Sequence, residues 1–363
     1  MKKHPDYILL GLLGFLLALG IVILASVSAS FSFKKFGDTY YLLRHQILLG
    51  LIPGLVLAFL AFKINLAKIK KWIFPILLGN LLLMVLVFLP VIGSGSEKAS
   101  RWIYLGSFSF QPSELLKLVF ILYLATWLVS KIEKKIKDSQ PFIGFVMIIG
   151  IVTLLLVLQP NISTLGVIVF TAVLMYFAIN TPPWHSVLIV LLGLIALYSL
   201  IQIAPYRIER LAVFLNPETD PMGIGYQTKQ ALITVGAGGA GGVGLGMSVQ
   251  KWGFLPESVA DSIFAVFCEE TGFIGGSILI FLFLIFLWRG FKIAKGTPDK
   301  FSQLTAVGIT SWITIQAFVN IGAMIGLLPL TGIPLPFVSY GGSALIIELA
   351  GAGILLNISK NSQ

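Results

Sequence analysis

Apolar residues along the chain gather in long runs of about 20, separated by short polar stretches or by glycine and proline. A run of that length is enough for an α-helix to cross the hydrocarbon core of a membrane. Two separators, residues 159–161 and 180–183, combine asparagine with proline and suit tight turns between helices. The pattern predicts an all-α, polytopic membrane domain over 1–363, with ten spans at 7–29, 45–62, 73–92, 112–130, 141–158, 163–180, 184–204, 263–288, 303–328 and 339–359.

The composition supports a membrane protein. Hydrophobic residues make up 57% of the chain, charged residues only 11%, and the mean hydropathy is +0.97, which is far from soluble usage. The net charge of +10 does not indicate nucleic-acid binding, because the cations stand in short clusters between the apolar runs. Cys268 is the only cysteine, which excludes an intrachain disulfide, and the three scattered histidines form no zinc-type pattern.

The distribution of lysine and arginine predicts the orientation of the spans. Ten spans place both termini on one side, and that side carries fifteen cations against nine on the other. The positive-inside rule then predicts that both termini lie in the cytoplasm. The first apolar run is long for a signal peptide and nine more spans follow, so we expect a retained first helix rather than a cleaved one. The long segment 205–262 and the loops 93–111 and 329–338 are expected on the outer face, where ATP is absent. The short cytoplasmic loops carry no nucleotide-binding motif, which argues against a pump or kinase driven by nucleotide.

Four carboxylates stand close together where the long outer segment enters a span. Glu257 and Asp261 are four residues apart, so they share a face if the segment is helical. One alternative is that Asp261 only caps the following helix. Glu269 and Glu270 lie about two turns inside that helix, too deep for capping and costly in hydrocarbon unless paired or in a wet cavity. The expected partners for these two carboxylates are Lys117 and Arg101.

A second polar group lies at the start of the fourth predicted span. Gln111-Pro112-Ser113-Glu114 has the features of a helix start, and Lys117 follows Glu114 by one turn. The pair could simply neutralise itself. An ionisable residue inside a span is nevertheless a candidate functional group.

Two further stretches are rich in glycine or proline, which changes the conformations open to the backbone. The run GAGGAGGVGLG at 236–246 follows no predicted strand, so it is not a dinucleotide fingerprint. It is either a tightly turning loop or one whose N–H groups approach a phosphate or sugar. At 326–345, three prolines exclude a regular helix, and irregular backbone at membrane depth must be buried in protein or line a cavity. That stretch either only packs or forms a wall of the substrate site.

Six motifs of the chain, in order, resemble the SEDS proteins (shape, elongation, division and sporulation), the group of FtsW, RodA and SpoVE. They are ASRWI at 99–103, QPSELLK at 111–117, GVGLGMSVQK at 242–251, LPESVADSIF at 255–264, EETGFIG at 269–275 and TGIPLPFVSYGGS at 331–343. The motif at 242–251 is closer to the division-type FtsW branch than to RodA. One departure is Val259-Ala260, where the family often has His-Thr before the aspartate.

The resemblance implies the ten-helix SEDS fold and a peptidoglycan glycosyltransferase of the bacterial plasma membrane. Such enzymes polymerise lipid II on the outer face and work with a class B penicillin-binding protein, beside other division or elongation proteins. The family's essential aspartate corresponds to Asp261, which we expect to act as the catalytic base. The residues expected to bind substrate or its diphosphate are Glu114, Lys117, Arg101, Lys251, Glu257 and Glu270. Lys117 is also a candidate to hold Asp261 charged and oriented.

Several points stay open at this stage. A divalent cation such as magnesium could bridge Asp261 or Glu114 to the diphosphate. A RodA-like role in elongation is an alternative to division. The rival from another class is a lipid II flippase, since membrane acids and lysines are common in transporters. The charges cluster on the predicted outer face, whereas a flippase needs them accessible from both faces. A third alternative is a scaffold without activity.

Overall fold

The computed structural model describes residues 4–89, 101–105, 108–133, 139–179, 181–182, 184–203, 206–220 and 222–362. Its α-helices are α1 (Tyr7–Phe36), α2 (Tyr41–Gln46), α3 (Ile52–Lys63), α4 (Leu66–Leu86), α5 (Pro112–Glu133), α6 (Ser139–Leu158), α7 (Ile162–Phe177), α8 (Trp184–Ile203), α9 (Tyr206–Leu215), α10 (Ile224–Ala237), α11 (Ile263–Gly296), α12 (Lys300–Met324) and α13 (Gly342–Ser359). A π-helix, η1 (Ile47–Leu51), joins α2 to α3, and η2 (Pro217–Thr219) and η3 (Gln250–Trp252) are single 3₁₀ turns.

The polytopic all-α fold is confirmed. Among the described residues, seven helical stretches are long and apolar enough to cross a membrane: α1, the continuous stretch Tyr41–Lys63, α4, α5, α11, α12 and α13. The other three predicted spans coincide with the shorter apolar helices Phe142–Leu158, Ile162–Phe177 and Trp184–Ala196.

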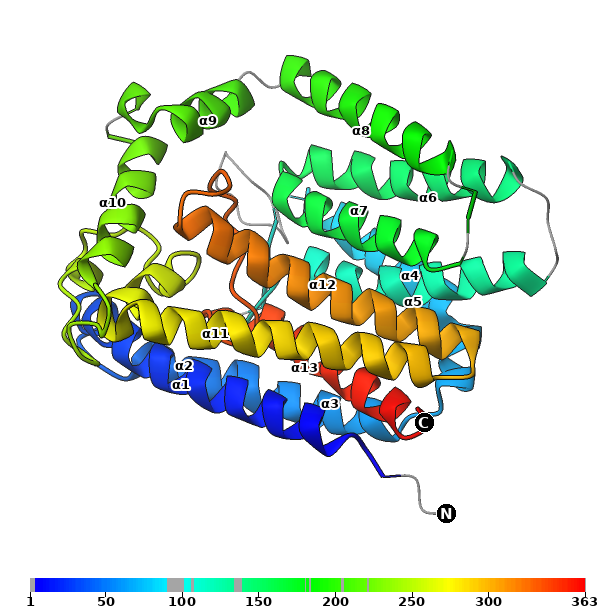
Figure 1. Ribbon diagram of the computed structural model, residues 1–363, viewed down its shortest axis with the longest axis horizontal. Coiled ribbons are helices and arrows are strands. Elements are labelled where there is room, and N and C mark those ends of the chain that lie inside the picture. Colours follow the sequence, from blue (N-terminus) through cyan, green and yellow to red (C-terminus); the bar gives the residue numbers. More distant parts are fainter. Residues whose placement is uncertain are drawn as a thin grey trace.

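The helix α12 is the centre of the bundle. It packs against α11, α7, α5 and α13, and Figure 1 shows it running between α11 and the pair α5 and α7. Its apolar side chains, among them Ile309, Trp312 and Ile313, are almost fully buried. Because the helix is buried on nearly all sides, its polar side chains also lie inside the protein. Two of these, Gln316 and Asn320, are important for the site below.

The long helices run between two ends of the molecule (Figure 1). At one end the backbone N of Asp6 donates to Ser359 Oγ at 2.9 Å, and Arg289 Nε donates to Asp6 Oδ2 at 2.7 Å. These contacts place the start of α1, the last part of α11 and the end of α13 together. The opposite end carries α9, α10 and the loops around residues 238–262 (Figure 1).

Three local features differ from the sequence predictions. The segment 205–262, for which the sequence predicted no elements, contains α9, α10 and two 3₁₀ turns. The segment 103–110 includes a short antiparallel hairpin, β1 (Ile103–Leu105) with β2 (Phe108–Phe110), which pairs Ile103 with Phe110. The first helix is also longer than predicted, extending to Phe36, and Gly37 ends it with a left-handed φ of 70°. The irregular backbone predicted between α12 and α13 is confirmed.

The glycine-rich run packs its backbone directly on α11. A Cβ on Gly242 would collide with the backbone of Glu270, and Gly272 gives α11 a kink with φ 69° at the same contact. The N–H groups of Val243 and Gly244 donate to the carbonyls of Glu269 and Glu270, each at 3.0 Å. The run therefore needs glycine for close backbone approach, and α11 accepts from two of the N–H groups that could have met a phosphate.

Candidate active site

Asp261 lies directly before α11, in a segment that is fixed to the irregular stretch between α12 and α13. Asn320 Nδ2, on α12, donates to the carbonyl of Asp261 and to that of Ile333, each at 2.7 Å. The backbone N of Tyr340 donates to the Val259 carbonyl at 3.0 Å. Asp261 is thus held at the end of the bundle opposite the termini, with the irregular stretch beside it.

The Asp261 carboxylate accepts no hydrogen bond from any residue that the structure describes. The N-cap of α11 is Ser262, and no side chain caps the helix, which contradicts the capping alternative for Asp261. Gly332 leaves room for the carboxylate, since a Cβ there would stand 3.3 Å from Asp261 Oδ2. Burial, and in addition the charge of Glu257, raise the pKa of Asp261 to about 6. At neutral pH this group is an ionised base whose oxygens remain available to a ligand.

The irregular stretch beside Asp261 is held from inside the bundle. Glu348, on α13, accepts from the backbone N of Phe337 at 2.9 Å and from Gln316 Nε2 at 3.0 Å. Gln316 Nε2 also donates to the Pro334 carbonyl at 3.1 Å. Phe337 has a φ of 64°, a left-handed conformation that is uncommon outside glycine. The Glu348 carboxylate therefore helps to maintain an unfavourable backbone conformation in the wall next to the site.

Glu114 and Lys117 extend this contact into α5. Lys117 Nζ lies 2.7 Å from Glu114 Oε2, donates to Gln316 Oε1 at 2.7 Å, and stands 5.4 Å from the centroid of the Trp312 ring. The side chains of Lys117 and Glu114 are only 2% and 5% exposed. We call Glu114, Lys117, Gln316 and Glu348 the bundle cluster.

The prediction that Lys117 contacts Asp261 is wrong, because Lys117 Nζ is directed to Glu114 and Gln316 instead. The connection between the two groups runs along α12. Gln316 and Asn320 stand four residues apart on one face, the first at Lys117 and the second at the backbone of Asp261.

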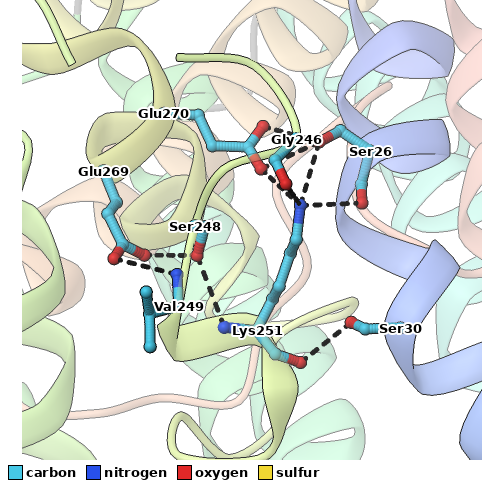
Figure 2. Close-up of polar contacts among 8 residues, drawn as sticks. All are labelled: Ser26, Ser30, Gly246, Ser248, Val249, Lys251, Glu269 and Glu270. Atoms are coloured by element: carbon cyan, nitrogen blue, oxygen red, sulfur yellow. Dashed lines mark hydrogen bonds and ion pairs between the residues drawn. The ribbon is translucent and has the colours of Figure 1, made fainter. Parts of the chain in front are cut away.

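A second buried ion pair joins the glycine-rich loop to α11 and α1 (Figure 2). Lys251 Nζ lies 2.7 Å from Glu270 Oε1, with side chains 4% and 1% exposed, and also donates to the Gly246 carbonyl at 2.8 Å. The Ser26 hydroxyl contacts both oxygens of Glu270, at 2.8 and 2.6 Å, and Ser30 Oγ donates to the Lys251 carbonyl at 3.0 Å. Since three separate segments meet here, the pair fixes the loop against the bundle.

Glu269 holds the same loop on its other side, as Figure 2 shows. Its carboxylate accepts from the Ser248 hydroxyl and from the backbone N of Val249 at 3.3 Å. The expectation that Glu269 and Glu270 pair with Lys117 or Arg101 is therefore wrong. We call Ser26, Ser30, Gly246, Ser248, Lys251, Glu269 and Glu270 the loop cluster.

Arg101 is bound to the turn between α6 and α7. Its Nε donates to the Gln159 carbonyl at 3.0 Å, and its terminal nitrogen donates to the Pro160 carbonyl. The adjacent helix start contacts the irregular stretch, because Ser163 Oγ donates to the Thr331 carbonyl. Arg101 thus lies at the same end of the bundle as Asp261, and substrate contact by its guanidinium stays a prediction.

The remaining predicted ligand, Glu257, is exposed and lines a cavity at this end of the molecule. It has a left-handed φ of 50°. Among the described residues, no group of three or more His, Cys, Asp or Glu side chains is arranged to hold a metal ion. A magnesium ion would need substrate oxygens besides one or two of these carboxylates, which is how proteins commonly bind it.

Sequence reasoning missed three residues that connect these groups: Gln316, Asn320 and Glu348. Two signals could have found them. Glu348 is the only charged residue in the predicted span 339–359, and an acid inside a span needs a partner. Gln316 and Asn320 are polar residues four apart in an apolar run, which places them on one helix face.

Comparison with known proteins agrees with this arrangement. A family model for FtsW, RodA and SpoVE, described as cell cycle protein, matches residues 7–363. Stage V sporulation protein E of Bacillus subtilis is 41% identical over 100% of this chain and 99% of its own length. A probable peptidoglycan glycosyltransferase FtsW of Geobacter metallireducens is 39% identical, covering 98% of this chain and 95% of that protein.

Solved structures agree as well. A chain from a study of polymerization and crosslinking by a peptidoglycan synthase complex superposes with a TM-score of 0.79 at 30% identity, covering 99% of this chain and 98% of that chain. The rod shape determining protein RodA of Thermus thermophilus superposes with a TM-score of 0.72 at 28% identity, with the same coverage. The motifs, the fold and these relatives agree, and the chain therefore belongs to the SEDS family of FtsW, RodA and SpoVE.

Proposed function

We propose that this chain is a peptidoglycan glycosyltransferase that joins lipid II disaccharides into glycan strands. The observation that carries the proposal is the Asp261 carboxylate, which has a raised pKa, accepts no hydrogen bond from a described residue and belongs to the segment whose residues 255–259 line a cavity. Relatives named peptidoglycan glycosyltransferase, 36–39% identical across nearly the whole chain, support the same activity.

The reaction needs a base and a stabilised leaving group. The 4-hydroxyl oxygen of the acceptor sugar attacks the anomeric carbon of the donor, and a new C–O bond forms with inversion. The bond between that carbon and the lipid diphosphate breaks, and the diphosphate leaves with the electron pair. The hydroxyl proton passes to Asp261, whose pKa of about 6 leaves it ionised at neutral pH and still able to accept a proton.

The other predicted site residues divide into two roles. Glu114, Lys117, Lys251 and Glu270 have buried side chains occupied by one another or by neighbouring protein groups, so we assign them to positioning the two segments beside Asp261. Glu257 and Arg101 remain candidates for contact with substrate.

We further propose that the end of the bundle with Asp261 faces the outside of the plasma membrane and that both termini are cytoplasmic. The lysine and arginine distribution supports this orientation. The partner we propose is a class B penicillin-binding protein, because the matching synthase complex couples polymerization with crosslinking. The identities with SpoVE and FtsW support a role in division or sporulation more than in elongation.

The test is glycan synthesis from purified lipid II by the full-length protein with Asp261 replaced. Asp261→Asn keeps the size and removes the base, so we expect activity to fall at least about 100-fold, the usual contribution of a general base. The wild-type rate should rise as the pH increases through about 6, because the carboxyl loses its proton there. Glu218→Gln is the matched control, since Glu218 is an exposed carboxylate paired with Lys229 in the same segment.

Near-normal synthesis by Asp261→Asn would overturn the base assignment. Liposomes with labelled lipid II separate the rival function from this one. Translocation without chain growth by the wild-type protein would indicate a flippase. A scaffold would show neither activity in the wild-type protein, and neutralising all four acids would do no harm.

A further inference from the structure

A cavity of about 450 Å³ lies between the last turns of α1 and residues 251–259. That volume is within the range of small-molecule sites. The residues of its lining that matter here are Phe31, Lys34, Lys35, Trp252, Gly253 and Glu257. The loop cluster fixes the two walls to each other, since Ser30 Oγ on α1 donates to the Lys251 carbonyl (Figure 2). The cavity therefore has a stable frame.

The free positive charge of this cavity comes from α1. Lys34 makes no hydrogen bond or ion pair with any described residue. Lys35 Nζ lies over the rings of Phe31 and Phe36, 5.5 Å from each centroid, and has no carboxylate partner among the described residues. Lys251 also lines the cavity, but Glu270 neutralises its ammonium group. Two uncompensated cations thus face one lining carboxylate, that of Glu257.

The helix dipole explains why Lys34 and Lys35 stand at the end of α1, but it does not explain where the amine of Lys34 lies. Cations are favoured in the last turn of a helix by its dipole, and Lys34 and Lys35 occupy that turn of α1. The dipole does not require Lys34 to reach across to the other wall. Its Nζ lies 3.6 Å from where a Cβ on Gly253 would stand, and Gly253 has a φ of 112°, which only glycine adopts readily. The amine therefore lies at the cavity, between α1 and the opposite segment.

The surroundings favour an anion that is carried by a lipid. The cavity stands at the end of a membrane-spanning helix, where lipid phosphates are found, and lysine is a common ligand of phosphate groups. Trp252 and Phe31 add exposed apolar surface beside the cations. Val259 lines the cavity, and Asp261 follows two residues later in the same segment. A phosphate group held by the lysines would therefore contact a cavity whose wall belongs to the chain segment that carries the base.

We propose that this cavity binds the diphosphate of the lipid-linked sugar, with Lys34 and Lys35 as its cationic ligands and Trp252 beside the lipid. The proposal rests on the glycosyltransferase function above and adds a substrate-binding site that uses residues outside the six sequence motifs. It also replaces Lys251 as the cation for the diphosphate, because the amine of Lys251 is already paired.

The experiment measures binding of undecaprenyl diphosphate to the full-length protein in detergent by native mass spectrometry. Lys34→Gln/Lys35→Gln should weaken binding about 10- to 30-fold, because two exposed ion pairs with the diphosphate are lost. Undecaprenol, which lacks phosphate, should bind both proteins equally. Lys34→Arg/Lys35→Arg should retain most of the affinity for the diphosphate, because the charges remain.

The matched control is Lys292→Gln/Lys295→Gln at the opposite end of α11. Both lysines are exposed, and Lys292 lies over the Trp288 ring at 5.3 Å, as Lys35 lies over Phe31. This control should leave binding unchanged. Equal affinity of the Lys34→Gln/Lys35→Gln protein and wild type would overturn the proposal. Equal competition by phosphatidylglycerol would also overturn it, because the site would then be one for any anionic lipid.

A failure of this inference is distinguishable from a failure of the proposed function. If the wild-type protein makes glycan but its diphosphate affinity does not depend on Lys34 and Lys35, only the binding site is wrong. If it makes no glycan but binds the diphosphate through these lysines, the site stands and the polymerase function is wrong.

Discussion

The bundle cluster and the loop cluster each bury one lysine against carboxylates, and they differ in how far apart the partners lie along the chain. Lys117 and Glu114 are one helical turn apart on α5. Lys251 and Glu270 are separated by 19 residues, and Ser26, which completes that contact, lies on the first helix. The first pair forms as soon as α5 forms, whereas the second forms only when three segments have come together.

The two clusters also support different walls of the site. The bundle cluster holds the irregular stretch between α12 and α13 through Gln316 and Glu348. The loop cluster holds the glycine-rich loop and the start of the segment that leads to Asp261. Asp261 lies where these walls meet, so its position depends on two independent sets of buried charges. Buried pairs are poor sources of net stability, but removing one partner is costly.

The largest effect is expected at Lys117. Lys117→Met leaves Glu114 and Glu348 buried without a compensating cation, and we expect it to lower the free energy of unfolding by about 3–5 kcal/mol. Circular dichroism of the detergent-solubilised protein during thermal unfolding would measure the change. Lys292→Met, at an exposed lysine, is the control. If Lys117→Met unfolded with the same midpoint temperature as the wild-type protein, the bundle cluster would not be a coupled unit.

A smaller effect is expected at Lys251, because Glu270 keeps the hydroxyl of Ser26 after the lysine is lost. Lys251→Met should cost about 2–3 kcal/mol, a value reduced by the hydrogen bond that remains to the charged group. The double variant Lys251→Met/Glu270→Leu should recover most of this loss, since it removes both charges. A double-mutant cycle on unfolding free energies measures the coupling. Additive single effects would mean that the two side chains do not interact.

The same contrast explains how far the sequence could predict the molecule. The spans were predictable because membrane helices need about 20 apolar residues, and Glu114 with Lys117 was recognisable because i,i+3 residues share a helix face. The pairing of Lys251 with Glu270 was not predictable, because it depends on how the loop folds back on α11 and α1. Asp261 was correctly predicted to lie just before the start of a helix. The space around its carboxylate was not predictable, because it depends on Gly332, 71 residues later in the chain.

The smallest effect is expected at Ser248, a member of the loop cluster whose hydroxyl donates to Glu269 and accepts from the backbone N of Lys251 at 3.4 Å. Ser248→Ala removes the hydroxyl that donates to Glu269, while the backbone N of Val249 still donates to the same carboxylate. We expect a loss of about 1–2 kcal/mol in unfolding free energy, the cost of one hydrogen bond to a buried charged group. Glycan synthesis should fall less than in Lys251→Met, because Lys251 and Glu270 still anchor the loop to α1. A loss of synthesis equal to that of Lys251→Met would mean that both sides of the loop must be fixed for Asp261 to work, and that the loop cluster acts as one unit.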